Sequence, residues 1–192
     1  MSSNLFPFKV LVLTGLLVIG SGLFAKEIGG VTLPDTLSVG GKDLVLNGAG
    51  LRKKLFIKVY AGGLYLPAKT KKGEDVINTD QATVIRLHFI YNGVSADKLT
   101  GAWNDGFKAA TKGNTGDIQK EIDAFNALFT DEAKKNDVYD ISYVPGQGVA
   151  LKINGTEKGK VEASEKFRKA LWGIWLGKKP ADSGLKKGML GS

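Results

Sequence analysis

The stretch NGAGLRKKLFIKVYAGGLYL, Asn47 to Leu66, decides the fold of this 192-residue chain. It opens with Gly48-Ala49-Gly50 and places Arg52 at the start of a largely apolar, strand-like run. An arginine that enters a protein interior is costly unless an anion neutralises it. The chain has no Asp or Glu between Asp43 and Glu74. The anion must therefore come from a distant side chain or from the carboxylate of a ligand.

Tyr60 follows Arg52 by eight residues in the same run. On one straight strand the two side chains would share a face but lie about 26 Å apart, at ~3.3 Å per residue. They can meet on one ligand only if the chain reverses, and residues 53–56 contain no Gly or Pro that would indicate a turn. The pattern predicts a strand from Leu55 to Leu66, in which Gly62-Gly63 marks a bulge or close packing against the backbone. Two interpretations stay open: a shared anion site, or an Arg52 paired with a distant carboxylate beside a Tyr60 that only packs in the sheet.

Composition excludes several classes of site. The chain has no cysteine and one histidine, so disulfides, thiolate metal sites and His-rich metal sites are not expected, and no cofactor is predicted. The formal net charge is +8, but no run of lysines exceeds two and aromatic residues are not interleaved with them. This pattern argues against nucleic-acid binding and favours a solvated basic surface, which allows weak contact with anionic membrane surfaces or acidic ligands.

The first 25 residues have the features of a signal peptide. Lys9 is the only charged residue before Lys26, and the run from Val10 to Phe24 is apolar. That run has the length of a signal-peptide core and is short of the roughly 20 residues that span a bilayer. We therefore expect Met1 to Ala25 to be removed and residues 26–192 to act as one domain in the periplasm or outside the cell. The alternative is an uncleaved membrane anchor.

The rest of the chain alternates between strand-like and helix-like patterns. Strand periodicity is found in Ala82–Tyr91, Val138–Val144 and Val149–Ile153, and Asn154-Gly155 is a strong hairpin turn signal. Helical periodicity is found in Ala96–Ala110, in a segment capped by Thr115 or Asp117 that reaches Phe129, and in Glu162–Leu176. Regular βαβ alternation is missing. The order predicts one α+β domain with a mostly antiparallel sheet and helices on one face.

Two blocks of sequence carry a resemblance to a known family. The first is LNGAGLRKKLFIKVYAGGLYL, Leu46 to Leu66, and the second is ALWGIWLGKKPAD, Ala170 to Asp182. With the strand, the Trp-bearing helix and the hairpin between them, they resemble the chalcone isomerase-like family, in particular its short bacterial secreted branch. The resemblance runs from about Ile28 to Gly191. It implies an open-faced β-sandwich, in which helices cover a large antiparallel sheet and the ligand cleft lies between the two layers.

The family includes enzymes and binding proteins, and the resemblance assigns roles residue by residue. In plant chalcone isomerases an arginine holds the reactive oxyanion, and a threonine, a tyrosine, an asparagine and a further Thr or Ser arrange the ketone and water. In the fatty-acid-binding members an arginine and a tyrosine hold the ligand carboxylate. Arg52 matches the arginine, and Tyr60 stands at the threonine position, as in the fatty-acid binders. The tyrosine and asparagine of the enzyme fall near Ser95 and Ala102, which are not equivalent. Asn104 is two residues away on another side of the helix.

The last Thr or Ser of the enzyme falls near Thr156 and has no clear counterpart. Most of the isomerase machinery is therefore missing, whereas the carboxylate-binding pair Arg52 and Tyr60 is present. A guanidinium is a rigid fork suited to a carboxylate, and a tyrosine hydroxyl adds another donor. Arg52 by itself does not discriminate, because it would also stabilise a phenolate.

We therefore expect a non-catalytic protein of the cell envelope that binds a fatty acid or a similar amphipathic carboxylate through Arg52 and Tyr60. An alternative is an isomerase, an intramolecular lyase, that acts on a chalcone-like or other small aromatic substrate. A third is a structural or partner-binding role in the periplasm. The sequence does not indicate the oligomeric state.

Overall fold

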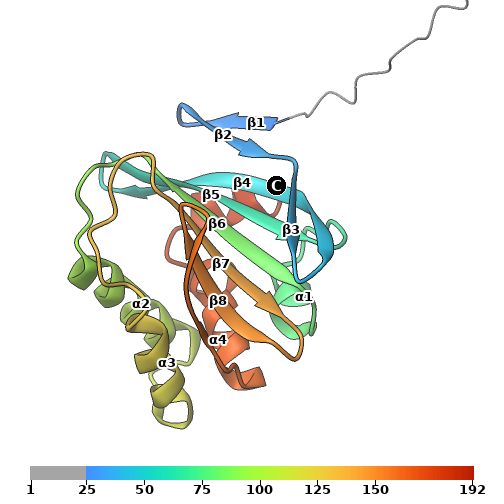
Figure 1. Cartoon of the computed structure of the whole chain (residues 1–192), viewed down its shortest axis with the longest axis vertical. Helices are drawn as coiled ribbons and strands as arrows, with labels where there is room; N and C mark the ends of the chain where they lie inside the picture. The colour runs from blue at the N-terminus through green and yellow to red at the C-terminus, as the bar shows by residue number, and fades with distance from the viewer. Residues whose placement is uncertain (1–24) are drawn as a thin grey trace, which may run out of the picture.

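The computed structural model describes residues 25–192, in which a curled antiparallel sheet is covered by helices (Figure 1). The seven strands of this sheet follow one another in chain order: β3 Thr36–Val39, β4 Lys42–Lys54, β5 Ile57–Leu66, β6 Thr83–Phe89, β7 Val138–Val144, β8 Gly148–Ile153 and β9 Thr156–Val161. A separate hairpin consists of β1 Ala25–Ile28 and β2 Val31–Pro34. The helices are α1 Gly73–Asn78, α2 Ala96–Ala110, the 3₁₀ turn η1 Gly116–Ile118, α3 Gln119–Asn126, α4 Glu165–Leu176 and α5 Ser183–Met189.

This architecture confirms the α+β fold class predicted from the sequence. Of the expected signal peptide, Met1 to Ala25, only Ala25 lies within the described residues, as the first residue of β1. No helix in residues 25–192 is long and apolar enough to cross a membrane. The last large helix begins at Glu165 rather than at Glu162, because the Ser164 hydroxyl caps it by accepting a hydrogen bond from the N–H of Phe167 at 3.1 Å.

The predicted strand from Leu55 to Leu66 is wrong at its start. The chain reverses at Leu55 and Phe56, so that Lys54 of β4 faces Ile57 of β5. Leu55 has a φ of 56°, in the left-handed region. This conformation costs a residue with a Cβ about 1–2 kcal/mol. The sequence gives no sign of the turn because residues 53–56 contain no Gly, Asn, Asp or Pro. Pairing along the two long strands offsets that cost, and a bulge beyond Arg52 adjusts the register.

Glycines on β4 allow α5 to approach the strand backbone to backbone. A Cβ at Gly50 would lie 2.7 Å from the carbonyl oxygen of Leu185, and one at Gly188 would lie 2.5 Å from that of Ala49. Gly48 meets the carbonyl oxygen of Gly188 in the same way. The Gly48-Ala49-Gly50 motif is therefore a docking surface for a helix. Helix α5 was not predicted from the sequence, because it has seven residues and two of them are helix-weakening glycines.

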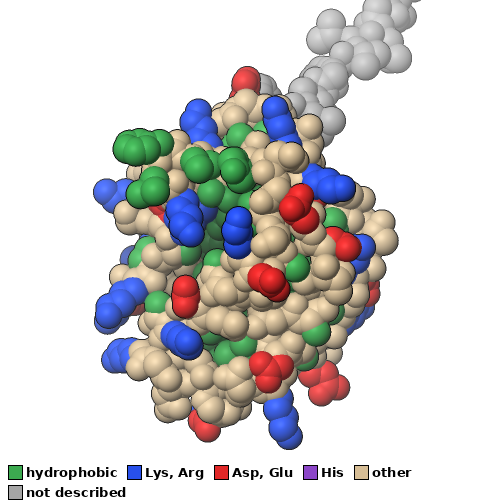
Figure 2. Space-filling model, turned by 90° about the vertical axis from the view of Figure 1, so that its left-hand side faces the viewer, with side chains coloured by type: hydrophobic (Ala, Val, Ile, Leu, Met, Phe, Trp, Pro, Cys, Tyr) green, Lys and Arg blue, Asp and Glu red, His purple; other side chains and the backbone are tan. Residues whose placement is uncertain are grey.

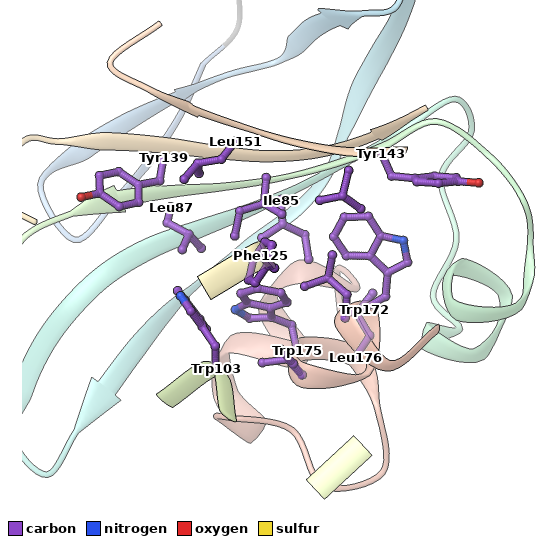
Figure 3. Close-up of a cluster of buried hydrophobic side chains, with 14 of the residues drawn as sticks. Ile85, Leu87, Trp103, Phe125, Tyr139, Tyr143, Leu151, Trp172, Trp175 and Leu176 are labelled. Atoms are coloured by element: carbon purple, nitrogen blue, oxygen red, sulfur yellow. The ribbon is translucent and has the colours of Figure 1, made fainter. Parts of the chain in front are cut away.

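The main core lies between the sheet and the helices, and it is rich in aromatic side chains (Figure 3). Helix α2 contributes a stripe of Leu99, Trp103 and Phe107, whereas α4 is buried over most of its surface and carries Trp172 and Trp175. A smaller cluster lies apart from this core and includes Leu33 of β2 and Tyr65 of β5. Tyr65 donates a hydrogen bond to the carbonyl oxygen of Pro34 at 2.9 Å, which ties the β1–β2 hairpin to the sheet.

The contact between β4 and α5 predicts a large effect of one methyl group. Gly50→Ala should lower the free energy of unfolding by about 1–3 kcal/mol, because the new Cβ meets rigid backbone atoms of Leu185. Gly101→Ala is the matched control: this exposed glycine of α2 has nothing within 4 Å of its Cβ position, so the substitution should stabilise the helix by roughly 0.5–1 kcal/mol. Urea unfolding followed by circular dichroism measures both. Equal effects of the two substitutions would contradict the close packing.

Candidate functional site

Arg52 and Tyr60 are brought together as direct partners across β4 and β5. The reversal at Leu55 and Phe56 replaces the separation of a straight strand with a cross-strand pairing, in which Cβ atoms typically lie roughly 5 Å apart. The two residues predicted to share a ligand are therefore neighbours. They lie near the closed end of the hairpin, where both strands run out beyond the core.

The N-cap of α5 supplies a carboxylate beside Arg52. One oxygen of Asp182 accepts a hydrogen bond from the N–H of Leu185 at 2.9 Å, and the other accepts one from the N–H of Lys53 at 3.0 Å. The Arg52 Nη1 lies 3.6 Å from that second oxygen, beyond hydrogen-bond distance. Arg52 thus has a distant acid as its counter-ion, which is one of the two interpretations that the sequence leaves open. The ion pair is loose, and the Arg52 side chain remains 26% exposed.

The guanidinium of Arg52 keeps most of its hydrogen-bonding capacity. Within residues 25–192 its hydrogen bond goes to the carbonyl oxygen of the adjacent Lys53. A guanidinium has five N–H donors in a planar fork, so several remain available to an incoming anion. An oxyanion that approached the fork would compete with Asp182 for the same charge.

Tyr60 is buried and its hydroxyl is oriented by a tryptophan. The indole N–H of Trp175 donates to the Tyr60 oxygen at 3.1 Å. Burial raises the pKa of Tyr60 to about 12, although the Trp175 hydrogen bond and the charge of Arg52 act against this shift. The phenol therefore stays protonated at neutral pH. Because Trp175 occupies an acceptor position of the oxygen, the O–H proton is free to be donated.

A second tryptophan adds an unused donor to this region. The Trp103 ring lies 5.4 Å from that of Trp175 and 5.7 Å from that of Phe129, measured between centroids. Its indole N–H is buried and has no hydrogen-bond partner among the described residues. Leaving such a group unpaired typically costs ~1–3 kcal/mol. Figure 3 shows the nitrogen edge of the ring turned toward the sheet. Sequence periodicity places Trp103 and Trp175 in predicted helices without indicating these polar roles.

Of the positions near which the other isomerase groups fall, Ser95 and Asn104 make hydrogen bonds within the fold, and Ala102 and Thr156 are exposed. Ser95 caps α2 by accepting a hydrogen bond from the N–H of Lys98 at 3.4 Å, and Ala102 lies exposed on that helix. Asn104 accepts a hydrogen bond from the side chain of Asn126 at 2.8 Å. Thr156 begins β9, at the far edge of the sheet. In the described part of the chain, no three His, Cys, Asp or Glu residues gather into a group that could hold a metal ion.

A separate groove of about 920 Å³ lies along α2 and α4. Its apolar lining includes Ile77, Ala110 and Leu176. The lysines around it come from several segments: Lys108, Lys112, Lys166, Lys169, Lys178, Lys179 and Lys186. Neither Arg52 nor Tyr60 lines this groove. We take the Arg52–Tyr60 pair as the candidate site because it combines a loosely paired guanidinium with a protonated, oriented hydroxyl.

Comparison with known proteins places the chain in a family. Residues 25–191 match the chalcone isomerase-like family. The chain belongs to that family, as the resemblance of its two sequence blocks predicted. Among solved structures, this chalcone isomerase-like chain is similar to the crystal structure of a fatty-acid binding protein from Arabidopsis thaliana, with a TM-score of 0.71 and 19% sequence identity over 87% of this chain and 96% of the other. A likeness at this identity shows a shared fold. A search of curated proteins finds no match.

The Asp182 carboxylate predicts a pH-dependent part of the stability. Partial burial alone would raise the pKa of Asp182, but hydrogen bonds from the backbone N–H groups of Leu185, Lys53 and Gly184 and the charge of Arg52 lower it overall. A carboxylate with a lowered pKa stabilises the fold above its ordinary pKa, and that contribution is lost as the pH falls through the lowered value.

Asp182→Asn should therefore reduce the free energy of unfolding by ~1.5–3 kcal/mol at neutral pH, the usual contribution of a hydrogen bond to a charged group. The difference from the wild type should close as the pH falls below about 4. Urea unfolding at a series of pH values measures this gap. Asp105→Asn, at an exposed position on α2, is the control and should show little change. A gap for Asp182→Asn that stays constant with pH would contradict the assignment.

Proposed function

We propose that this chain binds a fatty acid or a similar amphipathic carboxylate and does not catalyse a reaction. The observation that carries the proposal is the cross-strand pair of Arg52 and Tyr60, in which the guanidinium is loosely paired and the phenol is protonated. Membership of the chalcone isomerase-like family supports it, since one structurally similar protein is a fatty-acid binding protein.

The head group binds near the closed end of the β4–β5 hairpin, beside Arg52 and Tyr60. The fork of Arg52 donates to the carboxylate oxygens and displaces the weak interaction with Asp182, while the Tyr60 hydroxyl donates its free proton. The Trp175 N–H keeps the Tyr60 oxygen in position. A phenol with a pKa of about 12 is a hydrogen-bond donor at neutral pH, which suits binding of an anion rather than removal of a proton.

The acyl chain lies between the sheet and the helices. From Tyr60 the interior continues through Phe89 and Tyr139, whose rings meet at centroid distances of 5.7 and 4.9 Å. Trp103 and Phe129 line the helical side of the same region. These side chains fill the space, so α2 must shift to admit a ligand. The backbone of α2 lies closest to α4 and α3 rather than to a strand, so we propose that α2 is the element that moves.

Fatty-acid titration tests the head-group assignment. Arg52→Gln should weaken binding of a fluorescent long-chain fatty acid by at least about tenfold, equivalent to ~1.4 kcal/mol. Tyr60→Phe should weaken it several-fold, in line with the loss of a hydrogen bond worth about 1 kcal/mol. Asp182→Asn should strengthen binding, because it removes the anion that competes for Arg52. Lys108→Gln with Lys112→Gln, which removes two charges from the α2–α4 groove, should leave the affinity unchanged.

Two outcomes would overturn the proposal. If Arg52→Gln binds as tightly as the wild type while the double lysine variant loses affinity, the ligand occupies the groove and Arg52 only pairs with Asp182. If purified protein cyclises a chalcone with enzyme-like turnover, the non-catalytic assignment is wrong. We expect the chalcone to be recovered unchanged, since loss of even one positioned donor typically costs ~10²–10³ in rate and two are replaced here, at Ser95 and Ala102.

We also propose that Met1 to Ala25 is removed and that the domain works in the periplasm or outside the cell. The family match begins at residue 25, where the apolar segment ends, which supports this boundary. Cell fractionation with N-terminal sequencing should find a soluble protein that begins at or next to Lys26. An intact N-terminus in the membrane pellet, released only by detergent, would instead establish an anchor.

A further inference from the structure

The tip of the β4–β5 hairpin, defined here as Lys53 to Lys58, exposes large apolar side chains. In the rest of the described chain, nearly all large apolar side chains are at least partly buried. Phe56 is 99% exposed, Leu55 is 87% exposed and Ile57 is 45% exposed. Within residues 25–192 the other large apolar side chain that is similarly exposed is Tyr91, at 44%. The Tyr91 N–H donates to the carbonyl oxygen of Val59 at 3.1 Å, so this residue lies beside the hairpin.

The face shown in Figure 2 displays this concentration at one corner, where apolar side chains protrude from the surface with Lys and Arg beside them. A cluster of projecting apolar groups is unusual for an exposed surface and commonly marks an interaction site. The lower part of the same face is more mixed, with Lys, Arg, Asp and Glu side chains spread among polar groups.

The residues of the turn are unfavourable for the stability of a hairpin. Two-residue hairpin turns favour Asn, Asp and Gly, which adopt positive φ with little strain and interact well with water. Here Leu55 takes the left-handed position with a φ of 56°, and Phe56 next to it is almost fully exposed. Residues that break a local rule without a gain in packing are expected where a protein has a function to perform.

Positive charge surrounds the apolar tip. Lys53 and Lys58 face each other across the two strands, and Lys54 lies between Lys53 and the turn. All three lysines are exposed. Like charges opposite one another destabilise a strand pair, so this arrangement also has a cost within the fold. The acid beside it, Asp182, is already engaged by the Lys53 N–H and by Arg52.

We propose that the hairpin tip docks on an anionic lipid bilayer. Leu55, Phe56 and Ile57 enter the boundary between head groups and acyl chains, and the lysines contact the anionic head groups. A narrow tip suits a bilayer better than a folded protein partner, since stable protein interfaces bury about 800 Å² on each side. Docking requires no bound fatty acid. It would also bring Arg52, about 10 Å along the strand from the turn, close to the membrane surface.

Vesicle cosedimentation tests the docking in the absence of fatty acid. The wild type should bind anionic vesicles made of a mixture of phosphatidylglycerol and phosphatidylcholine. It should bind vesicles of phosphatidylcholine alone only weakly. The double substitution Leu55→Asn with Phe56→Gly should reduce binding at least about tenfold while the fold stays about as stable, because Asn adopts the positive φ of position 55 with less strain than Leu and Phe56 makes almost no buried contact. All variants are prepared as residues 26–192, so that the apolar N-terminal segment does not contribute to vesicle binding.

Variants that remove lysines measure the electrostatic contribution to vesicle binding. Lys53, Lys54 and Lys58 changed to Gln should lose preferential binding to the anionic vesicles. The matched control changes Lys108, Lys112 and Lys178 of the α2–α4 groove to Gln, which removes the same net charge from another exposed region and should retain most of the binding. Phe56→Trp should show a blue shift in fluorescence with anionic vesicles, because the three native tryptophans are buried and contribute a constant background.

The proposal is overturned if the Asn-Gly variant binds anionic vesicles as well as the wild type, or if the groove variant loses binding and the tip variant does not. It is also overturned if light scattering shows that the wild type dimerises and that the Asn-Gly variant is monomeric with unchanged vesicle binding. In that case the tip contacts a second copy of the chain. Failure of fatty-acid binding would leave these outcomes unaffected, because no fatty acid is present.

Discussion

The backbone contact between β4 and α5 is the constraint on which the site depends. Because Gly48 and Gly50 have no side chain, the backbone of β4 can lie against carbonyl groups of α5. For the same reason, Gly188 of α5 can lie against the carbonyl group of Ala49. Asn47 reinforces it, since its side chain donates to the carbonyl oxygen of Met189 at 2.7 Å. With the helix fixed there, its N-cap Asp182 is held beside Arg52 by the N–H groups of Leu185 and Lys53. The close packing of β4 and α5 thus determines where the negative charge of Asp182 lies relative to Arg52.

The site is poised because its charges are only partly satisfied. Each oxygen of Asp182 accepts a hydrogen bond from a backbone N–H group, but Asp182 lies 3.6 Å from the Arg52 nitrogen, so it neutralises the charge without binding the guanidinium fork tightly. Tyr60 has the opposite character, because it is buried, neutral and held by Trp175. A loosely paired cation next to a fixed neutral donor, at the edge of an aromatic interior, favours a ligand with a carboxylate at one end and an apolar chain at the other.

Sequence reasoning reached the fold class and the family because long periodic segments and the two motif blocks were informative. Helix Ala96–Ala110 and strand Val138–Val144 have the predicted bounds, and Arg52 was recognised as unusual in an apolar run. The turn at Leu55 was missed because leucine is not a typical turn residue. The chain reverses there because β4 and β5 pair along their length on either side of the turn. Helix α5 was missed because tertiary packing against glycines, rather than helix propensity, stabilises it. The unpaired Trp103 N–H depends on the three-dimensional surroundings, which periodicity does not describe.

A crystal structure of the protein with a bound long-chain fatty acid would test the Arg52–Tyr60 site most directly. We expect the carboxylate within hydrogen-bond distance of Arg52 and the Tyr60 hydroxyl, with Asp182 still capping α5 but further from the guanidinium. We also expect the acyl chain between the sheet and α2, with α2 moved outward. A carboxylate held by lysines of the α2–α4 groove, with the Arg52–Asp182 pair unchanged, would show that Arg52 and Tyr60 do not bind the ligand.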